Sequence, residues 1–177
     1  ANEAECVKLL KSPRQEVRHL CLKITGRNTF KSAAPVLLKL AGKEKSRENI
    51  YELFLTMTRL GNPEFLPVFR DNITHDDELV AGLCVDMIGN YKDETQVPKL
   101  IAMVKEAEAE DRFEKCSLAT AKAVEVLGIL GSGDVLDFLV TVLHHKNPTA
   151  RRLIHEELVK SGEKAVPFIA KAFDTHR

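Results

Sequence analysis

The chain has 177 residues, of which 44% are hydrophobic and 29% charged, a composition ordinary for a globular protein. Its 26 basic residues (Lys and Arg) balance its 26 acidic residues, which argues against nucleic-acid binding because that needs a basic field. The sequence has no apolar run of about 18 residues and no secretion signal in residues 1–10, so we expect a cytoplasmic protein that makes no membrane contact.

Residues 1–11 match the second helix of a helical pair, because Cys6, Val7 and Leu10 occupy its apolar positions. The first helix of that pair is missing, and no polar helix closes the other end of the chain. Repeat arrays need polar caps. We therefore expect a fragment of a longer array, or further repeats or another subunit at the uncapped ends.

The rest of the chain repeats one pattern, two amphipathic segments joined by a tight turn, in units at about 12–45, 46–75, 76–112, 113–146 and 147–177. Proline is tolerated in the first turn of a helix, where its missing N–H is not needed. It marks four of the five second helices, whose reference residues are Pro35, Pro67, Pro98, Asp137 and Pro167. These are separated by 32, 31, 39 and 30 residues, which predicts a solenoid.

Further positions keep the same register. The first helices are expected to begin at cap-type residues, namely Ser12-Pro13, Ser46, Asp76-Asp77 and Asn147-Pro148. Two positions of each first helix should face the second helix: Cys21, Leu53, Cys84, Ala123 and Ile154, and five residues later Gly26, Thr58, Gly89, Gly128 and Val159. The core of the second helices should include Ala34, Leu66, Val97, Leu136 and Val166, and near their ends Ala41, Ile73, Val104, Leu143 and Phe173.

The fourth unit shows the turn between two helices most clearly. Residues 131–133 (Gly-Ser-Gly) should end the first helix, and Asp134 should cap the second. Just before this unit, the long spacing holds residues 105–116, which are rich in helix formers and acidic in the middle. They are either an extended second helix followed by an exposed loop, or an insertion that binds a partner.

No catalytic, cofactor or metal site is indicated. The four cysteines lack CxxC spacing and fit as reduced core thiols. His155-Glu156 is not a zinc-protease motif because Val159 stands where the second histidine is needed. The adjacent His144 and His145 point in different directions on a helix, so we interpret them as a surface helix end.

At the level of whole segments, residues 16–26, 60–67, 127–139 and 150–169 resemble HEAT repeats. They are most similar to the short bacterial type called PBS-lyase HEAT-like repeats, and the resemblance covers nearly the whole chain. It implies an all-α fold, a right-handed α-α superhelix of about five helix pairs. It also implies that the second helices line the concave side.

That concave side is the expected binding surface for a protein or peptide. The candidate residues are Val36, Lys39, Val68, Arg70, Asp71, Lys99, Phe138, Thr141, Phe168 and Lys171. Phe138 and Phe168 either anchor a partner or pack between neighbouring units. Arg70 and Asn72 replace apolar residues, so that helix is either frayed, with Arg70 reaching water, or carries a polar site.

Three functions follow as hypotheses. The first is a non-enzymatic module that binds a protein or peptide partner. The alternative is an enzyme or accessory subunit, because some bacterial proteins that the chain resembles attach bilins to phycobiliproteins. The third is nucleic-acid binding, since one family of helical-repeat proteins excises damaged bases, but zero net charge and the absence of tryptophan argue against it.

Overall fold

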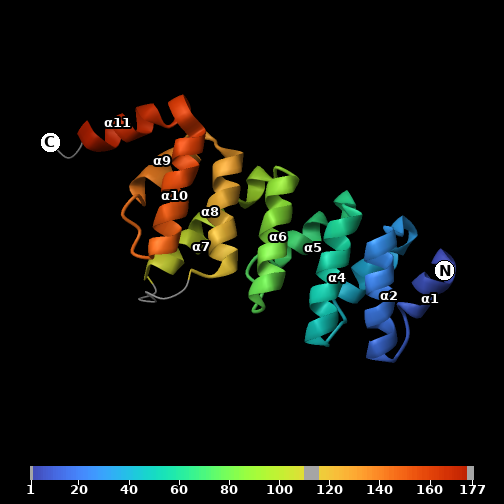
Figure 1. Cartoon of the computed structure of the whole chain (residues 1–177). Helices are drawn as coiled ribbons and strands as arrows, with labels where there is room; N and C mark the ends of the chain where they lie inside the picture. Colours follow the sequence, from blue (N-terminus) through green and yellow to red (C-terminus); the bar gives the residue numbers. More distant parts are fainter. Residues whose placement is uncertain (1, 110–115, 175–177) are drawn as a thin grey trace. The chain divides into compact units, whose positions relative to one another are not determined.

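The computed structural model describes residues 2–109 and 116–174, which form eleven α-helices with short 3-10 turns and no β-strand (Figure 1). The chain divides into two compact units, Ala1–Met87 and Ile88–Arg177. None of the helices in the described ranges is both long and apolar enough to cross a bilayer. The all-α repeat fold expected from the sequence is confirmed.

Unit 1 stacks its helices in chain order. It contains α1 (Glu3–Leu9), α2 (Gln15–Asn28), α3 (Ala34–Ala41), α4 (Arg47–Leu60), α5 (Leu66–Asp71) and most of α6 (Glu78–Asn90), with 3-10 turns at Lys31–Ala33 and Pro63–Phe65. Helix α2 packs along α4, while α1 lies against α2 and α3 against α4. The even-numbered helices α2 and α4 are thus the first helices of their pairs, and α3 and α5 are the second.

Unit 2 continues the same alternation. It contains the end of α6, α7 (Val97–Ala109), α8 (Leu118–Leu130), α9 (Gly133–Thr141), α10 (Pro148–Ser161) and α11 (Val166–Asp174), with 3-10 turns at Glu94–Gln96 and Gly162–Lys164. The first helix α8 packs against both α7 and α10, and the second helices α9 and α11 contact each other. Figure 1 shows α8 and α10 side by side.

The second helices begin where the prolines predict. Pro35, Pro67, Pro98 and Pro167 are each the second residue of their helix, α3, α5, α7 and α11. At that position the fixed φ of proline favours the helix and no intrahelical N–H is lost. The proline spacing therefore locates the pairs to within one residue.

The capping predictions hold for three of the first helices. The Ser46 and Asn147 side chains accept hydrogen bonds from backbone N–H groups in the first turns of α4 and α10, and Asp77 does so for α6. The Ser12-Pro13 prediction is wrong, because Arg14 precedes α2 and gives no side-chain cap; the Ser12 hydroxyl accepts from Arg14 N instead.

The turn after α8 also differs from its prediction in one detail. Gly131 ends α8 with φ 53°, a left-handed conformation that suits glycine. Helix α9 begins directly at Gly133, so Asp134 lies inside its first turn and does not cap it. A carboxylate there still interacts favourably with the helix dipole.

Helix lengths bear on two alternatives that the sequence left open. Helix α7 has 13 residues against eight in α3 and nine in α9, which agrees with an extended second helix. Residues 110–115 of the expected loop lie outside the described residues. Helix α5 has only six residues, and the Asn72 side chain donates to Val68 O at 2.8 Å at its end. This interaction accounts for asparagine at that position, and it agrees with a shortened helix.

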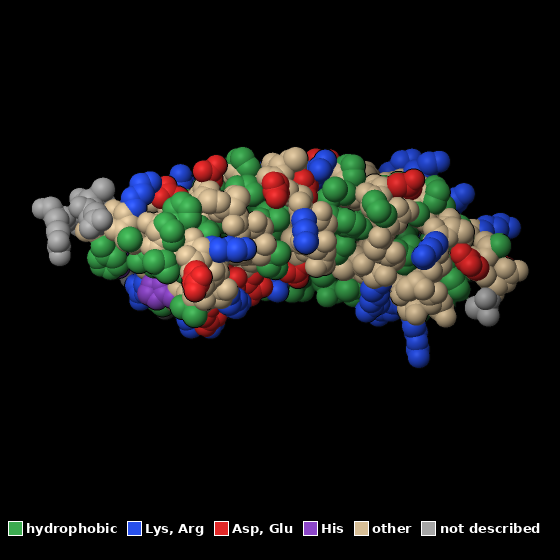
Figure 2. All heavy atoms as spheres, turned by 90° about the horizontal axis from the view of Figure 1, so that it is seen from above, with side chains coloured by type: hydrophobic (Ala, Val, Ile, Leu, Met, Phe, Trp, Pro, Cys, Tyr) green, Lys and Arg blue, Asp and Glu red, His purple; other side chains and the backbone are tan. Residues whose placement is uncertain are grey.

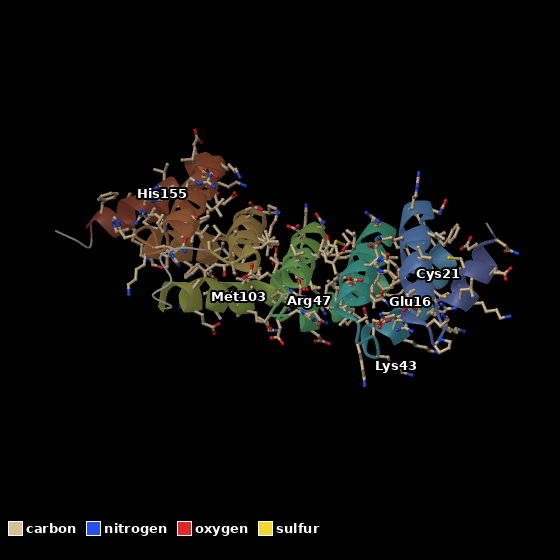
Figure 3. All side chains as sticks on the ribbon, turned by 60° about the horizontal axis from the view of Figure 1, so that its bottom comes forward. Glu16, Cys21, Lys43, Arg47, Met103 and His155 are labelled. Carbon is tan, nitrogen blue, oxygen red and sulfur yellow. The ribbon has the colours of Figure 1, made fainter. Side chains whose placement is uncertain are left out.

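The cysteines behave as core residues. Cys6, Cys21 and Cys84 are buried, Cys116 is half-buried, and all four are free thiols. Burial, together with the neighbouring Cys6, raises the pKa of Cys21 to about 11, and burial alone raises the pKa of Cys84 further. Cys21 lies on α2 toward α1, where the Cys6 thiol donates to its carbonyl at 3.5 Å (Figure 3). Thiols in this environment are poor nucleophiles.

The expectation that both adjacent histidines lie at the surface is wrong for His145. Its side chain is fully buried (0% exposed), whereas His144 is exposed. The His145 Nδ1 accepts from Asn147 N at 3.1 Å, and Nε2 lies 3.1 Å from Val104 O. With one nitrogen accepting, the other must carry the proton, so the ring is held as the neutral Nε2–H tautomer and ties α7 to the start of α10.

Candidate functional site

One recess in unit 2 is a groove between α9 and α11, with a volume of about 350 Å³. From α9 and the turn after it come Asp137, Val140, Thr141, Leu143 and His144, and from α11 come Phe168, Lys171, Ala172 and Phe173. Two consecutive second helices therefore form its walls. Such a recess between helices is a usual place for a ligand or a peptide side chain.

The groove combines apolar walls with an ion pair. Lys171 Nζ lies 3.1 Å from Asp137 Oδ1 and joins the two helices. The Phe168 ring packs over the start of α9, 3.4 Å from the position that a Cβ on Gly133 would take. Thr141 donates to Phe138 O at 2.6 Å, which leaves its oxygen able to accept from a ligand. The groove thus offers aromatic surface beside one cation and one anion.

Three of the ten candidate residues meet at this groove: Thr141, Phe168 and Lys171. Phe138, the fourth candidate on these helices, is buried with 8% of its surface exposed, and the Lys105 ammonium lies 5.6 Å from its ring centroid. Of the two alternatives for this aromatic residue, packing between neighbouring helices is the one observed. Phe138 therefore presents no accessible ring to a partner.

The other candidates lie elsewhere on the second helices. In unit 1, Val36, Val68 and Arg70 are half-buried while Lys39 and Asp71 are exposed, and in unit 2 Lys99 is exposed on α7. None of these six lines the groove between α9 and α11. Their role in binding a partner stays a prediction.

The sequence did not single out Asp137, His144 or Phe173 as groove residues. Phe173 was expected in the core, as was Val166, but 70% and 58% of their surfaces are exposed. The equivalent Ile73 and Val104 are fully buried. Among the described residues no helix pair follows α11, so none of them covers these apolar positions.

Side chains of both charges lie on one face of the molecule (Figure 2). Figure 2 shows acidic and basic side chains interspersed on the face it presents, with hydrophobic side chains gathered beside the grey C-terminal residues. Among residues 2–109 and 116–174 there is no group of three metal-ligating side chains. The groove itself is suited to binding an amphipathic molecule through shape and two charges.

Comparison with known proteins shows a likeness to solved structures. No family model matches the sequence, and no curated protein matches it. A solved structure, the complex of CpcE and CpcF of phycocyanin lyase from Nostoc sp. PCC7120, contains a similar chain. The match covers 94% of this chain and 67% of that one, with a TM-score of 0.72 and 16% sequence identity. The chain therefore has the fold of a HEAT-like helical-repeat protein.

Proposed function

We propose that this chain is a helical-repeat subunit of a bilin-lyase-like assembly, in which it holds the tetrapyrrole or the protein that receives it. The observation that carries the proposal is the fold match to a chain of the phycocyanin lyase complex over 94% of this sequence. At 16% identity that match concerns the backbone, so the chemical support has to come from the groove.

The groove between α9 and α11 has the properties that a bilin requires. A bilin is a flat, conjugated tetrapyrrole with N–H donors and carboxylate substituents. Phe168 and Phe173 offer apolar ring surface, Lys171 offers a cation for a carboxylate, and Asp137 can accept N–H bonds. A volume of about 350 Å³ encloses only part of such a molecule and leaves the rest accessible to an acceptor protein.

The proposed role is binding and not bond formation. The groove contains no cysteine, and the buried thiols of Cys21 and Cys84 have raised pKa values, so they are poor candidates for a covalent step. Any covalent bond to the chromophore would then be made by the acceptor protein.

The experiment is a titration with biliverdin, followed by absorbance and induced circular dichroism. We expect a shifted absorbance band on binding. The affinity for biliverdin should fall about tenfold in Lys171→Glu, since one charged contact is worth about 1.4 kcal/mol. It should be unchanged in Lys39→Glu on α3. Adding an acceptor apoprotein tests transfer, read as chromophore that stays on the protein in a denaturing gel. A normal melt with no spectral change would exclude the bilin proposal.

The second candidate is a protein-binding module that handles no chromophore. The exposed Phe173 and half-buried Phe168 beside Lys171 favour it, because aromatic anchors next to a charge are typical of peptide-binding surfaces. Selection from a displayed peptide library tests this role. We expect enriched peptides with apolar and acidic residues whose binding is lost in Phe168→Ala and Lys171→Glu, and a library without enrichment would contradict it.

A further inference from the structure

The contact between consecutive first helices follows one rule in both units. In each pair of consecutive first helices, the later helix places residues at positions i, i+3 and i+7 against the earlier one. We call these residues the back row. In α4 it is Asn49, Glu52 and Thr56, and in α10 it is Ala150, Leu153 and Glu157. All six side chains are at most 7% exposed. Burial of the back row shows that these positions form the seam between pairs.

The preceding helix presents a matching front row. In α2 the front row is Leu22 and Gly26, and in α8 it is Val124 and Gly128, four residues apart and so on one helix face. Thr56 Oγ1 donates to Leu22 O at 3.0 Å. A Cβ on Gly128 would lie 2.3 Å from Glu157 Oε2. The front row is small or apolar because another helix approaches it closely.

In α10 the same register places His155 and Val159 in the front row. His155 is exposed, and 80% of the Val159 surface is exposed. Both residues line a shallow hollow on the outer face of α10 together with Arg151, and Figure 3 labels His155 there. The face that holds the next helix in α2 and α8 is thus left uncovered in α10 by the described residues.

Arg151, on the same face of α10, indicates the charge that a partner should bring. Arg18, eight residues before Gly26, donates to the loop carbonyls of Ser12 and Pro13 and to both oxygens of the Glu44 carboxylate, in the loop that leads into α4. Arg151, eight residues before Val159, donates in the same way to His145 O of its own loop. It contacts no carboxylate in residues 2–109 and 116–174.

We propose that the front row of α10 docks the first helix of a helical-repeat partner subunit whose entering loop places a carboxylate on Arg151. The argument for this partner is charge complementarity. The internal seam between α2 and α4 includes the ion pair between Arg18 and Glu44, and Arg151 needs an equivalent carboxylate. The inference is independent of the groove between α9 and α11 and goes beyond the proposed function.

A second copy of this chain fits the surface less well. Its α2 has an exposed back row that includes Leu20 (61%) and Ile24 (38%). However, Ser12 occupies the position of Glu44 in the loop before α2, and the neighbouring Lys11 and Arg14 are basic. Helix α1 also already packs against α2, where α11 would have to lie. The second copy therefore lacks the carboxylate and would place further positive charge beside Arg151.

The test appends residues 43–75, the α4–α5 pair with its Glu44 loop, after α11 of the full chain as a tethered probe. Tethering supplies a high effective concentration. We expect amide exchange in α10 to slow roughly tenfold, and Val159→Asp or Arg151→Gln to abolish that protection. In the unextended chain Val159→Asp should leave the melt unchanged, because the side chain is exposed. Lys164→Gln is the control, since Lys164 is exposed in the turn after α10 and does not line the hollow.

Two results would overturn the inference. One is an extended chain whose α10 amides exchange as fast as before while circular dichroism shows that the added helices have formed. The other is concentration-dependent dimerisation of the original chain that Val159→Asp abolishes, because it would assign the surface to a second copy. Glu44→Gln in the appended pair should weaken the protection, which tests the carboxylate itself.

Discussion

Arg18 and Glu44 form a two-pronged ion pair between consecutive helix pairs, with Nε to Oε2 at 2.7 Å and Nη2 to Oε1 at 2.8 Å. The Glu44 side chain is 2% exposed and that of Arg18 16%. The same carboxylate accepts from the backbone N–H groups of Lys45 and Ser46 and from the Asn49 amide. One buried carboxylate thereby organises the loop into α4.

This arrangement predicts an acid-sensitive step in stability. The hydrogen bonds from Arg18 hold the pKa of Glu44 at about 2, below its ordinary value of 4.5. The ionised form is favoured by folding, so its stabilisation is complete above about pH 4.5 and is lost as the pH falls toward 2. We expect Glu44→Gln to lower the free energy of unfolding at pH 7 by roughly 2 to 3 kcal/mol. The difference from the wild type should shrink between pH 4.5 and 2.

Urea unfolding at several pH values measures the Glu44 effect. Glu48→Gln is the matched control, because Glu48 is exposed in the first turn of the same helix and should change stability little. Equal effects of the two substitutions at pH 7 would contradict the role given to the Arg18 pair.

Gly128 is predicted to be irreplaceable at the seam between α8 and α10. A Cβ there would lie 2.9 Å from Glu157 Cβ as well as 2.3 Å from Oε2, so turning the glutamate side chain does not relieve the overlap. We expect Gly128→Ala to lower stability by about 1 to 3 kcal/mol. A Cβ at Gly42 would meet no atom within 4 Å, so Gly42→Ala should change stability little. Thermal melts of the two variants measure the difference.

Two left-handed residues are predicted to be sites of stabilisation. Thr29 (φ 50°) and Lys92 (φ 51°) adopt the conformation that Gly61 (φ 59°) and Gly131 adopt at the ends of other first helices. A side chain in this region costs about 1 to 2 kcal/mol, offset in part by the greater unfolded-state freedom of glycine. We expect Thr29→Gly and Lys92→Gly to raise the melting temperature. Gly61→Ala, with open space around it, should lower the melting temperature through backbone strain alone.

His145 and His144 form a natural matched pair. We expect His145→Ala to lower the free energy of unfolding by about 2 to 4 kcal/mol, because it leaves a cavity and deprives Val104 O and Asn147 N of their partners. His144→Ala should stay within about 0.5 kcal/mol, since that side chain is exposed. Chemical denaturation of the two variants checks this, and similar losses would refute the role assigned to His145.

The sequence predicted the local features of this fold well, for physical reasons. Pro35 and Pro98 mark helix starts because proline acts on its own turn, and Ser46 caps α4 through an N–H three residues away. Such interactions are local, so the helix boundaries of one helix pair can be predicted from its own residues. The alternation of first and second helices follows from the same local patterns.

Long-range contacts were the part that sequence could not supply. Phe138 is buried under Lys105, which lies on a different helix pair, and His145 is held by Val104 O, 41 residues earlier. Phe173 occupies a core register yet is exposed. Whether a residue at a given helix position is buried depends on the neighbouring helix pair, and the sequence of one helix pair does not show how the next one packs against it.

The seams between first helices have a further consequence for how this chain could be rearranged. Thr56 donates to the α2 backbone at Leu22, whereas Glu157 lies over Gly128 of α8, so each joint has its own complementary partners. The helix pairs share a backbone plan, but their order is specified by side chains. Shuffling them would place a glutamate opposite a site shaped for a threonine, and the permuted protein would misassemble even though every helix could still form.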